Sequence, residues 1–281
     1  MDERQTTPTP GWTRLVVACA GVVGIVLMVQ AATVSSATYD EVAYLRIASD
    51  WWRKGETSEI TRMGSPLTFF KLQAGPAFFV LDRIGLGGLI DRPIVDQASL
   101  LPIVRLASLW IWLVAFGLTA TWSRRVYGPR AMAFSACLFA LSPNLLAHGS
   151  IATMEVPLIA ATAGAFLLFW RFLETGRLGF LAASAIVSGL AFSCKFTTVV
   201  YPPVLGLLWA VDRWRRGERR VCRTAWTVGL GMVGYVAVML AADWLVTGFA
   251  LIRPSPRTGS HPSAPDWGWR SVPGADPAAS G

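Results

Sequence analysis

The sequence predicts an all-α integral membrane protein with about seven transmembrane helices, and with amphipathic helices on the outer surface in its first long loop. Three observations support this fold class. Only 15% of the 281 residues are charged and 53% are hydrophobic, whereas soluble domains carry about 25% charged residues. The uncharged residues gather in long runs. Arginines gather in short loops between alternate runs, which is the pattern that sets membrane orientation.

The composition excludes several other classes of protein. A disordered chain needs low hydrophobicity, and four cysteines without a C-x-x-C pair cannot form a dense disulfide scaffold. Two histidines argue against a zinc or di-iron site. The formal net charge of +8 could indicate nucleic acid, but thirteen of the twenty-five bases fall on the predicted inner side. The charge therefore reports topology, and no nucleic-acid partner is expected.

The first predicted span is residues 15–38, which carry no charge for 24 positions. At about 1.5 Å per residue, this length crosses a hydrocarbon core of about 30 Å. A signal peptide is the alternative, with residues 15–29 as its apolar core and residues 34–37 as its cleavage site.

Six further runs complete the count of seven. They are residues 106–123, 131–154, 156–170, 178–194, 196–211 and 224–242. Residues 178–211 would be about 51 Å long as one helix and would place Lys195 in mid-membrane, so we predict a turn at Lys195. Residues 131–170 are also too long for one span, and we predict a break between His148 and Pro157.

Arginines in the short loops give the orientation. One set of loops holds Arg124, Arg125, Arg130, Arg171, Arg177, Arg213, Arg215, Arg216, Arg219, Arg220 and Arg223. The alternate short loops hold only Glu155 and Lys195. We therefore expect a cytoplasmic N-terminus (1–14), a seven-span module (15–252) and a disordered outer tail (253–281).

The outer loop, residues 39–101, contains two candidate helices. Residues 41–54 have a helix-like pattern, and an apolar stretch at residues 66–81 is interrupted by Lys71. We expect both to lie along the outer membrane surface.

Two adjacent carboxylates, Asp40 and Glu41, stand where the first span ends, and Tyr44 follows them. One interpretation is a capping box, in which Thr38 caps a helix and Glu41 bonds back to Thr38. The other is functional, because paired carboxylates at the bilayer edge suit chemistry on an amphiphilic substrate. The spacing leaves both open.

Glu155 opens a short predicted span, where a carboxylate is costly unless it faces water or a partner, so a functional role is the default. The alternative is a charge that complements the helix dipole, with Thr153 as the cap. Arg105, Lys71 and Lys195 also lie on the outer side, where they could bind a phosphate or anchor at the interface.

The order of these features resembles a known family of enzymes. The matching segments are Asp40-Glu41-x-x-Tyr44, Ser65-Pro66-Leu67, Arg105-Leu106, Tyr127-Gly128-x-Arg130, residues 141–149 (LSPNLLAHG), Thr153-x-Glu155-x-Pro157, Gly189-Leu190-Ala191 and Lys195-Phe196-Thr197. Together they resemble the membrane glycosyltransferases of the protein O-mannosyltransferase and lipid A aminoarabinose transferase type, which have the type C glycosyltransferase fold.

This resemblance implies an inverting transfer of a sugar from a polyprenyl-phosphate donor to an acceptor hydroxyl on the outer face of a plasma or inner membrane. The acceptor is a protein, a lipid or a glycan. Asp40 would be the general base, with Glu41 and Glu155 as further catalytic residues, of which Glu155 would help to hold the acceptor or the surroundings of the first carboxylate. Arg105, Lys71 and Lys195 would bind the donor phosphate, and Tyr44 and His148 would position substrate. No cofactor is expected to be required, and a divalent metal stays an open alternative.

Two departures from the family pattern matter. Glu155 stands where the family usually has Asp, and relatives usually continue for further spans and often an outer domain. A truncated gene, a fragment, or a short member completed by another chain would each explain the length. The alternatives to an enzyme are a non-catalytic membrane protein that binds lipid phosphate and, more weakly, a transporter.

Overall fold

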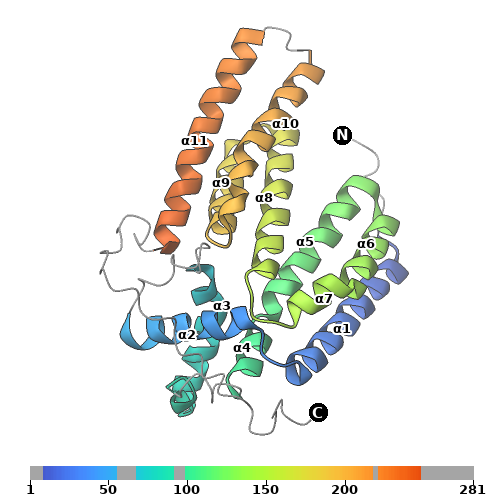
Figure 1. Cartoon of the computed structure of the whole chain (residues 1–281). Coiled ribbons are helices and arrows are strands. Elements are labelled where there is room, and N and C mark those ends of the chain that lie inside the picture. Colours follow the sequence, from blue (N-terminus) through green and yellow to red (C-terminus); the bar gives the residue numbers. More distant parts are fainter. Residues whose placement is uncertain (1–8, 56–67, 92–98, 218–220, 248–281) are drawn as a thin grey trace, which may run out of the picture. The chain divides into compact units, whose positions relative to one another are not determined.

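The computed structural model describes residues 9–55, 68–91, 99–217 and 221–247. These residues fall within one compact unit, Met1–Leu251. They form helices joined by short turns, with no strand in the described ranges (Figure 1). The all-α prediction is confirmed for this part of the chain, and the tail at residues 253–281 lies outside it.

Eleven α-helices and two short 3-10 helices are described. They are α1 Gly11–Val34, α2 Tyr39–Lys54, α3 Thr68–Arg83, η2 Gly87–Leu89, α4 Leu101–Ala107, α5 Leu109–Tyr127, α6 Pro129–Leu141, α7 Pro143–Gly149, α8 Glu155–Thr175, α9 Leu178–Phe192, η4 Phe196–Val200, α10 Tyr201–Arg215 and α11 Val221–Thr247.

Four segments are long and apolar enough to cross a membrane, judged by length and composition. They are Gly11–Val34, Leu101–Tyr127, Glu155–Thr175 and Ala225–Val246. The bent pair α6 and α7, which meet at 59°, would add a fifth. The chain is thus an integral membrane protein. Helix α9 is apolar, but its 15 residues reach only about 22 Å, and α10 has the same length. The count of seven spans therefore stays a prediction.

The helix breaks follow the chemistry of the sequence. α9 ends at Phe192 and α10 begins at Tyr201, so the predicted turn at Lys195 is confirmed. The break between α7 and α8 falls at residues 150–154, inside the predicted interval. One break was not predicted: residues 131–154 divide at Ser142, because Pro143 starts a new helix.

Both predicted helices of the outer loop are present, as α2 and α3. An exposed network around Arg53 joins them: its guanidinium donates to Asp82 at 3.0 Å and to Asp91 at 2.7 Å, and Trp52 Nε1 donates to Asp82 at 2.7 Å. Their position along a membrane surface stays a prediction.

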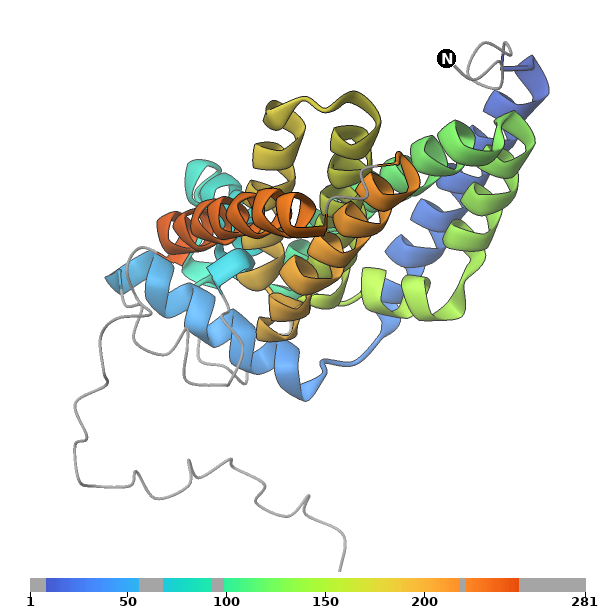
Figure 2. The ribbon, with the colours of Figure 1, turned by 90° about the horizontal axis from the view of Figure 1, so that it is seen from above.

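The arginine clusters gather at one end of the helices. Arg125 of α5 lies 3.8 Å from Glu174 of α8, and Arg216, directly after α10, donates to the Leu173 carbonyl at 2.6 Å. Figure 1 shows the C-terminal ends of α5, α8 and α10 directed toward the same, upper side of the view, and Figure 2 looks onto that side. This grouping is what the topology predicts, while the side of the membrane stays a prediction.

Small residues bring α8, α9 and α11 close together. Ser184 of α9 donates to the Ala165 carbonyl of α8 at 2.8 Å, and Ser188 shares a 2.6 Å hydrogen bond with the Tyr235 hydroxyl of α11. Gly189 lets the α11 backbone approach, because a Cβ there would contact the Met239 carbonyl oxygen and lie 2.8 Å from Ala242 Cβ. Close approach through small residues is typical of helix packing in membranes.

Gly189→Ala is therefore expected to destabilise the folded chain by about 1–3 kcal/mol, because overpacking must push α9 and α11 apart. The matched control is Gly179→Ala in the same helix, where an added Cβ has no neighbour within 4 Å. Chemical unfolding in detergent should separate the two variants. Equal stabilities would contradict the close α9–α11 contact.

Candidate active site

The turn from α1 into α2 carries the first candidate residues. Thr38 is the N-cap of α2, and its hydroxyl accepts a hydrogen bond from the Glu41 backbone N–H at 3.4 Å. The Glu41 carboxylate accepts the Thr38 backbone N–H at 3.0 Å in return. The capping-box interpretation is confirmed, and it places Asp40 and Glu41 in the first turn of α2.

Glu41 is fully buried and forms a two-pronged ion pair with Arg105. Arg105 Nε and Nη2 each donate to one carboxylate oxygen at 2.7 Å. The Ala152 backbone N–H donates to the same carboxylate at 2.7 Å. Burial alone would raise the pKa of Glu41, but these hydrogen bonds and the guanidinium charge outweigh it and hold that pKa below its ordinary value. Glu41 is thus an ionised carboxylate whose partners all belong to the protein.

Arg105 uses all five of its N–H groups inside the protein. Besides the two bonds to Glu41, Nη1 donates to the carbonyls of Ala32 at 3.0 Å and Ser35 at 2.9 Å, and Nη2 donates to Ser36 at 3.0 Å. Its side chain is 1% exposed. No N–H remains for a lipid phosphate in this arrangement, so Arg105 links the end of α1 to α2, and Glu41 links this pair to the turn before α8.

Asp40 has the opposite surroundings. It is exposed, and it makes no hydrogen bond or ion pair with any residue that the structure describes. Tyr44 follows it by one helical turn on α2. Burial, and then the negative charges of Asp40 and Glu155, raise the pKa of Tyr44 to about 12. The two carboxylates, which are remote in sequence, thus act on the same phenol.

Glu155 is half-buried at the first residue of α8, close enough to Cys194 for its charge to act on the thiol. The alternative interpretation placed Thr153 as the cap of this helix, and that part of it is wrong, although Glu155 does lie in the first turn. The N-cap is Met154, without a side-chain bond, and the Thr153 hydroxyl is buried with no hydrogen-bond partner among the described residues. The reason is local geometry: the helix begins at Glu155 directly after Met154, and the Thr153 hydroxyl forms no hydrogen bond with a backbone N–H of the first turn.

The structure gives fewer contacts for the three remaining candidates. Lys195 follows Cys194, is half-buried, and has no ion pair within the described ranges. His148 lies in the last turn of α7, and its buried Nδ1 has no hydrogen-bond partner among the described residues. Lys71 lies on α3, and its side chain is outside the described part.

Sequence reasoning missed the backbone groups of this site. The Ala152 N–H and the carbonyls of Ala32, Ser35 and Ser36 bind the Glu41–Arg105 pair, and any residue type supplies such groups. The sequence signal for such a site was the presence of two opposite charges, Glu41 and Arg105, each beside a long apolar run. Separately, no cluster of three or more His, Cys, Asp or Glu side chains in the described ranges could hold a metal ion.

Tyr44 allows the proximity of Asp40 and Glu155 to be measured. Glu155→Gln is expected to lower the pKa of Tyr44 from about 12 toward its ordinary value of 10.0, because one of the charges that disfavour the phenolate is gone. The difference in absorbance titration between each protein and its Tyr44→Phe derivative reports this residue alone. Asp50→Asn, on the same helix, is the control. An unchanged midpoint in Glu155→Gln would show that Glu155 is not near Tyr44.

A comparison with known proteins matches the part of the chain that begins just before α4, and this part does not include the turn that carries Asp40 and Glu41. The sequence model of the dolichyl-phosphate-mannose-protein mannosyltransferases matches residues 100–244, which include Arg105, Glu155 and Lys195 and make up just over half of the chain. Neither the curated proteins nor the solved structures contain a significant match. The family match supports the resemblance at the level of a mannosyltransferase-like glycosyltransferase. The chain belongs to the dolichyl-phosphate-mannose-protein mannosyltransferase family.

Proposed function

We propose that the chain is an inverting glycosyltransferase that moves a sugar from a polyprenyl-phosphate donor to an acceptor hydroxyl at the outer face of the membrane. One observation carries the proposal. Asp40 is an exposed carboxylate without a protein partner in the described ranges, and it shares Tyr44 with a second carboxylate, Glu155. This cluster lies at the helix ends opposite the arginine clusters, in a chain of a mannosyltransferase family.

Asp40 is the group best placed to act as the general base. In the proposed step its carboxylate removes the proton of the acceptor hydroxyl while that oxygen bonds to the anomeric carbon. The bond from this carbon to the phosphate oxygen breaks, and the electron pair leaves with the polyprenyl phosphate. Attack opposite the leaving group inverts the anomeric configuration. Lipid phosphate is a good leaving group, so the protein needs to stabilise charge rather than to supply a strong acid.

The other residues divide the supporting roles. Lys195 and Lys71 are the proposed partners of the leaving phosphate, since Arg105 is occupied by Glu41 and the end of α1. Tyr44 keeps its proton at physiological pH, because its pKa is about 12, and can donate it in a hydrogen bond. Glu155 and His148 are proposed to hold the acceptor. Glu41 positions Asp40 by fixing the first turn of α2.

The test is a transfer assay with the purified full chain in liposomes supplied with labelled polyprenyl-phosphate mannose. Peptide, lipid and glycan acceptors are offered in separate arms. The expected result is time-dependent release of polyprenyl phosphate, with the label in one acceptor fraction. Binding of the donor without release in any arm would overturn the proposal in favour of a lipid-phosphate-binding protein, and flux of the donor across sealed vesicles without transfer would overturn it in favour of a transporter.

A further inference from the structure

A groove of about 430 Å³ lies between α1 and α5, at the end of the helices where the arginines gather. This volume is within the range of about 300–1,000 Å³ that is usual for small-molecule sites. One wall is a single stripe of α1, with the helical spacing of three and four residues: Arg14, Val17, Ala18, Gly21, Val22 and Ile25. The other side is formed by Leu113, Phe116 and Arg124 of α5 and Met132 of α6. None of the residues in the proposed transfer reaction lines the groove.

The groove has the depth of one membrane leaflet. α1 and α5 run in opposite directions (Figure 1), so Arg14, near the start of α1, and Arg124, near the end of α5, lie at the same end of the groove. The lining continues from Arg14 to Ile25 on α1, and from Arg124 back to Leu113 on α5. Each of these stretches is about 16 Å long, which is close to half of a hydrocarbon core of about 30 Å.

Below the two arginines the groove is apolar and open on one side. Phe116 and Met132 are buried at its base. Gly21 leaves room beside the aromatic ring, since a Cβ at this position would already lie 3.5 Å from Phe116 Cε1. Val22 and Leu113 are 60% and 42% exposed at the edges. An alkyl chain can therefore enter from the side and lie against carbon atoms.

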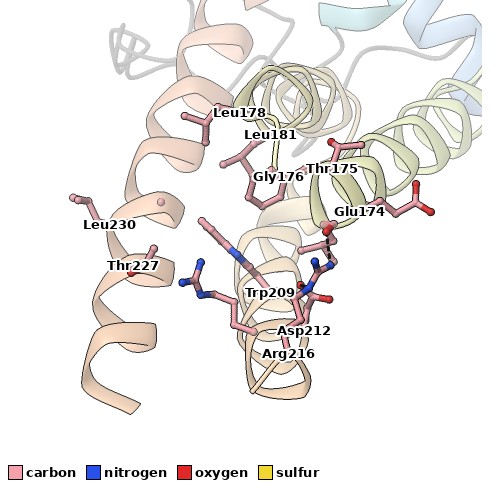
Figure 3. Close-up of a pocket in the computed structure, with 14 residues that line it drawn as sticks. Glu174, Thr175, Gly176, Leu178, Leu181, Trp209, Asp212, Arg216, Thr227 and Leu230 are labelled. Atoms are coloured by element: carbon pink, nitrogen blue, oxygen red, sulfur yellow. Dashed lines mark hydrogen bonds and ion pairs between the residues drawn. The ribbon is translucent and has the colours of Figure 1, made fainter. Parts of the chain in front are cut away.

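The charged end of the groove is basic without compensation. Arg14 and Arg124 line it, and no acid is among the described residues that do so. Neither guanidinium forms a hydrogen bond or an ion pair within the described part of the chain. The larger cavity between α8, α9, α10 and α11 is different, because its lining holds two arginines and two acids (Figure 3). Two uncompensated guanidinium groups favour an anionic guest.

A buried hydroxyl lines the groove as well. Thr9 lies just before α1 and is only 9% exposed, and its Oγ1 has no hydrogen-bond partner among the described residues. Buried polar side chains nearly always have such a partner, and leaving one without a partner is costly. A phosphate oxygen held by the arginines would accept the hydrogen bond of this hydroxyl.

We propose that the groove binds an anionic phospholipid, with its phosphate between Arg14 and Arg124 and one acyl chain along the apolar part. Basic pockets between helix ends suit anionic headgroups, which are concentrated in the cytoplasmic leaflet. A choline headgroup would instead bring a further positive charge to the two arginines. The lipid would hold the first half of α1 against α5. This binding site is separate from the proposed transfer site and does not require it to be active.

The experiment uses the full chain in mild detergent, with phosphatidylglycerol, phosphatidylcholine or inorganic phosphate added. Bound lipids are counted by native mass spectrometry, and thermal unfolding is followed in parallel. Phosphatidylglycerol is expected to bind roughly tenfold more tightly than phosphatidylcholine and to raise the unfolding midpoint. The Arg14→Gln/Arg124→Gln variant should lose roughly 25-fold in affinity, since each basic side chain near an anionic surface contributes a factor of about five. Thr9→Val keeps the shape of the side chain but removes the hydroxyl, and it should lose about fivefold.

Matched controls keep the test specific to the groove. Arg130→Gln/Arg177→Gln removes the same charge from exposed residues at the same end that do not line the groove, and it should bind phosphatidylglycerol as the wild type does. Ala18→Phe fills the groove without changing charge and should weaken binding, whereas Val23→Phe adds the same ring to an exposed position of α1 outside the lining and should not. Equal losses in both arginine pairs, unchanged binding by Ala18→Phe, or an equal rise in midpoint with inorganic phosphate would each overturn the proposal.

Discussion

Asp40→Asn is expected to slow sugar transfer by a factor of about 10² to 10⁴ while leaving the chain folded and able to bind its donor. Removing a positioned general base has an effect of this size. Asparagine has nearly the same shape as aspartate, but its amide cannot take a proton from the acceptor hydroxyl. Because Asp40 is exposed and bonds to nothing in the described ranges, its loss should cost little stability. The initial rate of polyprenyl-phosphate release, measured at saturating donor, gives the effect.

Two controls make this result specific to Asp40. Asp50→Asn changes the same residue type on the same helix, where Asp50 pairs with Lys54 at 2.8 Å, and it should leave the rate within a factor of about two. Asp40→Glu should recover part of the rate, because the base is present but displaced by one methylene. A wild-type rate in Asp40→Asn would remove Asp40 from the mechanism and leave Glu155 as the remaining candidate base.

The end of the first span shows how far sequence reasoning reaches. The spacing from Thr38 to Glu41 predicts a capping box because both partners lie within one turn, and local geometry is sufficient to form it. The same spacing does not reveal that the Glu41 carboxylate also binds a guanidinium from α4 and an amide from the turn before α8. Those contacts depend on how distant segments pack. Only the structure therefore shows that Glu41 is bound internally while its neighbour Asp40 is exposed.

The role of Arg105 could not be predicted from the sequence either. Its outward position and planar fork fit a phosphate and fit an internal ion pair equally well, since both present oxygen acceptors. Three of its acceptors are backbone carbonyls at the end of α1, which carry no sequence signal. Pro143 gives a second example. A proline at the first position of a helix indicates where that helix begins, but it does not determine the angle to the preceding helix, so the 59° bend between α6 and α7 could not be predicted.

The ion pair itself yields the second large effect. Arg105→Met is expected to destabilise the chain by about 3–5 kcal/mol, because it leaves the buried Glu41 charge without its main partner. Glu41→Gln should also be costly, since the two N–H groups of Arg105 that face Glu41 lose their anionic acceptor while the guanidinium charge stays buried. The double variant should lose less than the sum of the single losses, as expected for two groups in direct contact. The measurement is the free energy of unfolding by denaturant in detergent, for the wild type, the two single variants and the double variant, which together form a double-mutant cycle.

The comparison pair is Arg46 and Asp50, which lie 3.9 Å apart with side chains 40% and 29% exposed. Breaking that pair should cost about 0–1 kcal/mol. Acid gives an independent check. Because the pKa of Glu41 is lowered in the folded chain, its contribution to the free energy of unfolding is present above its ordinary pKa of 4.5 and is lost as the pH falls through the lower folded value. Glu41→Gln should lack this acid-sensitive part. If Arg105→Met instead retained full stability and weakened only donor binding, the guanidinium would belong to the phosphate site, and the internal pair would be replaceable.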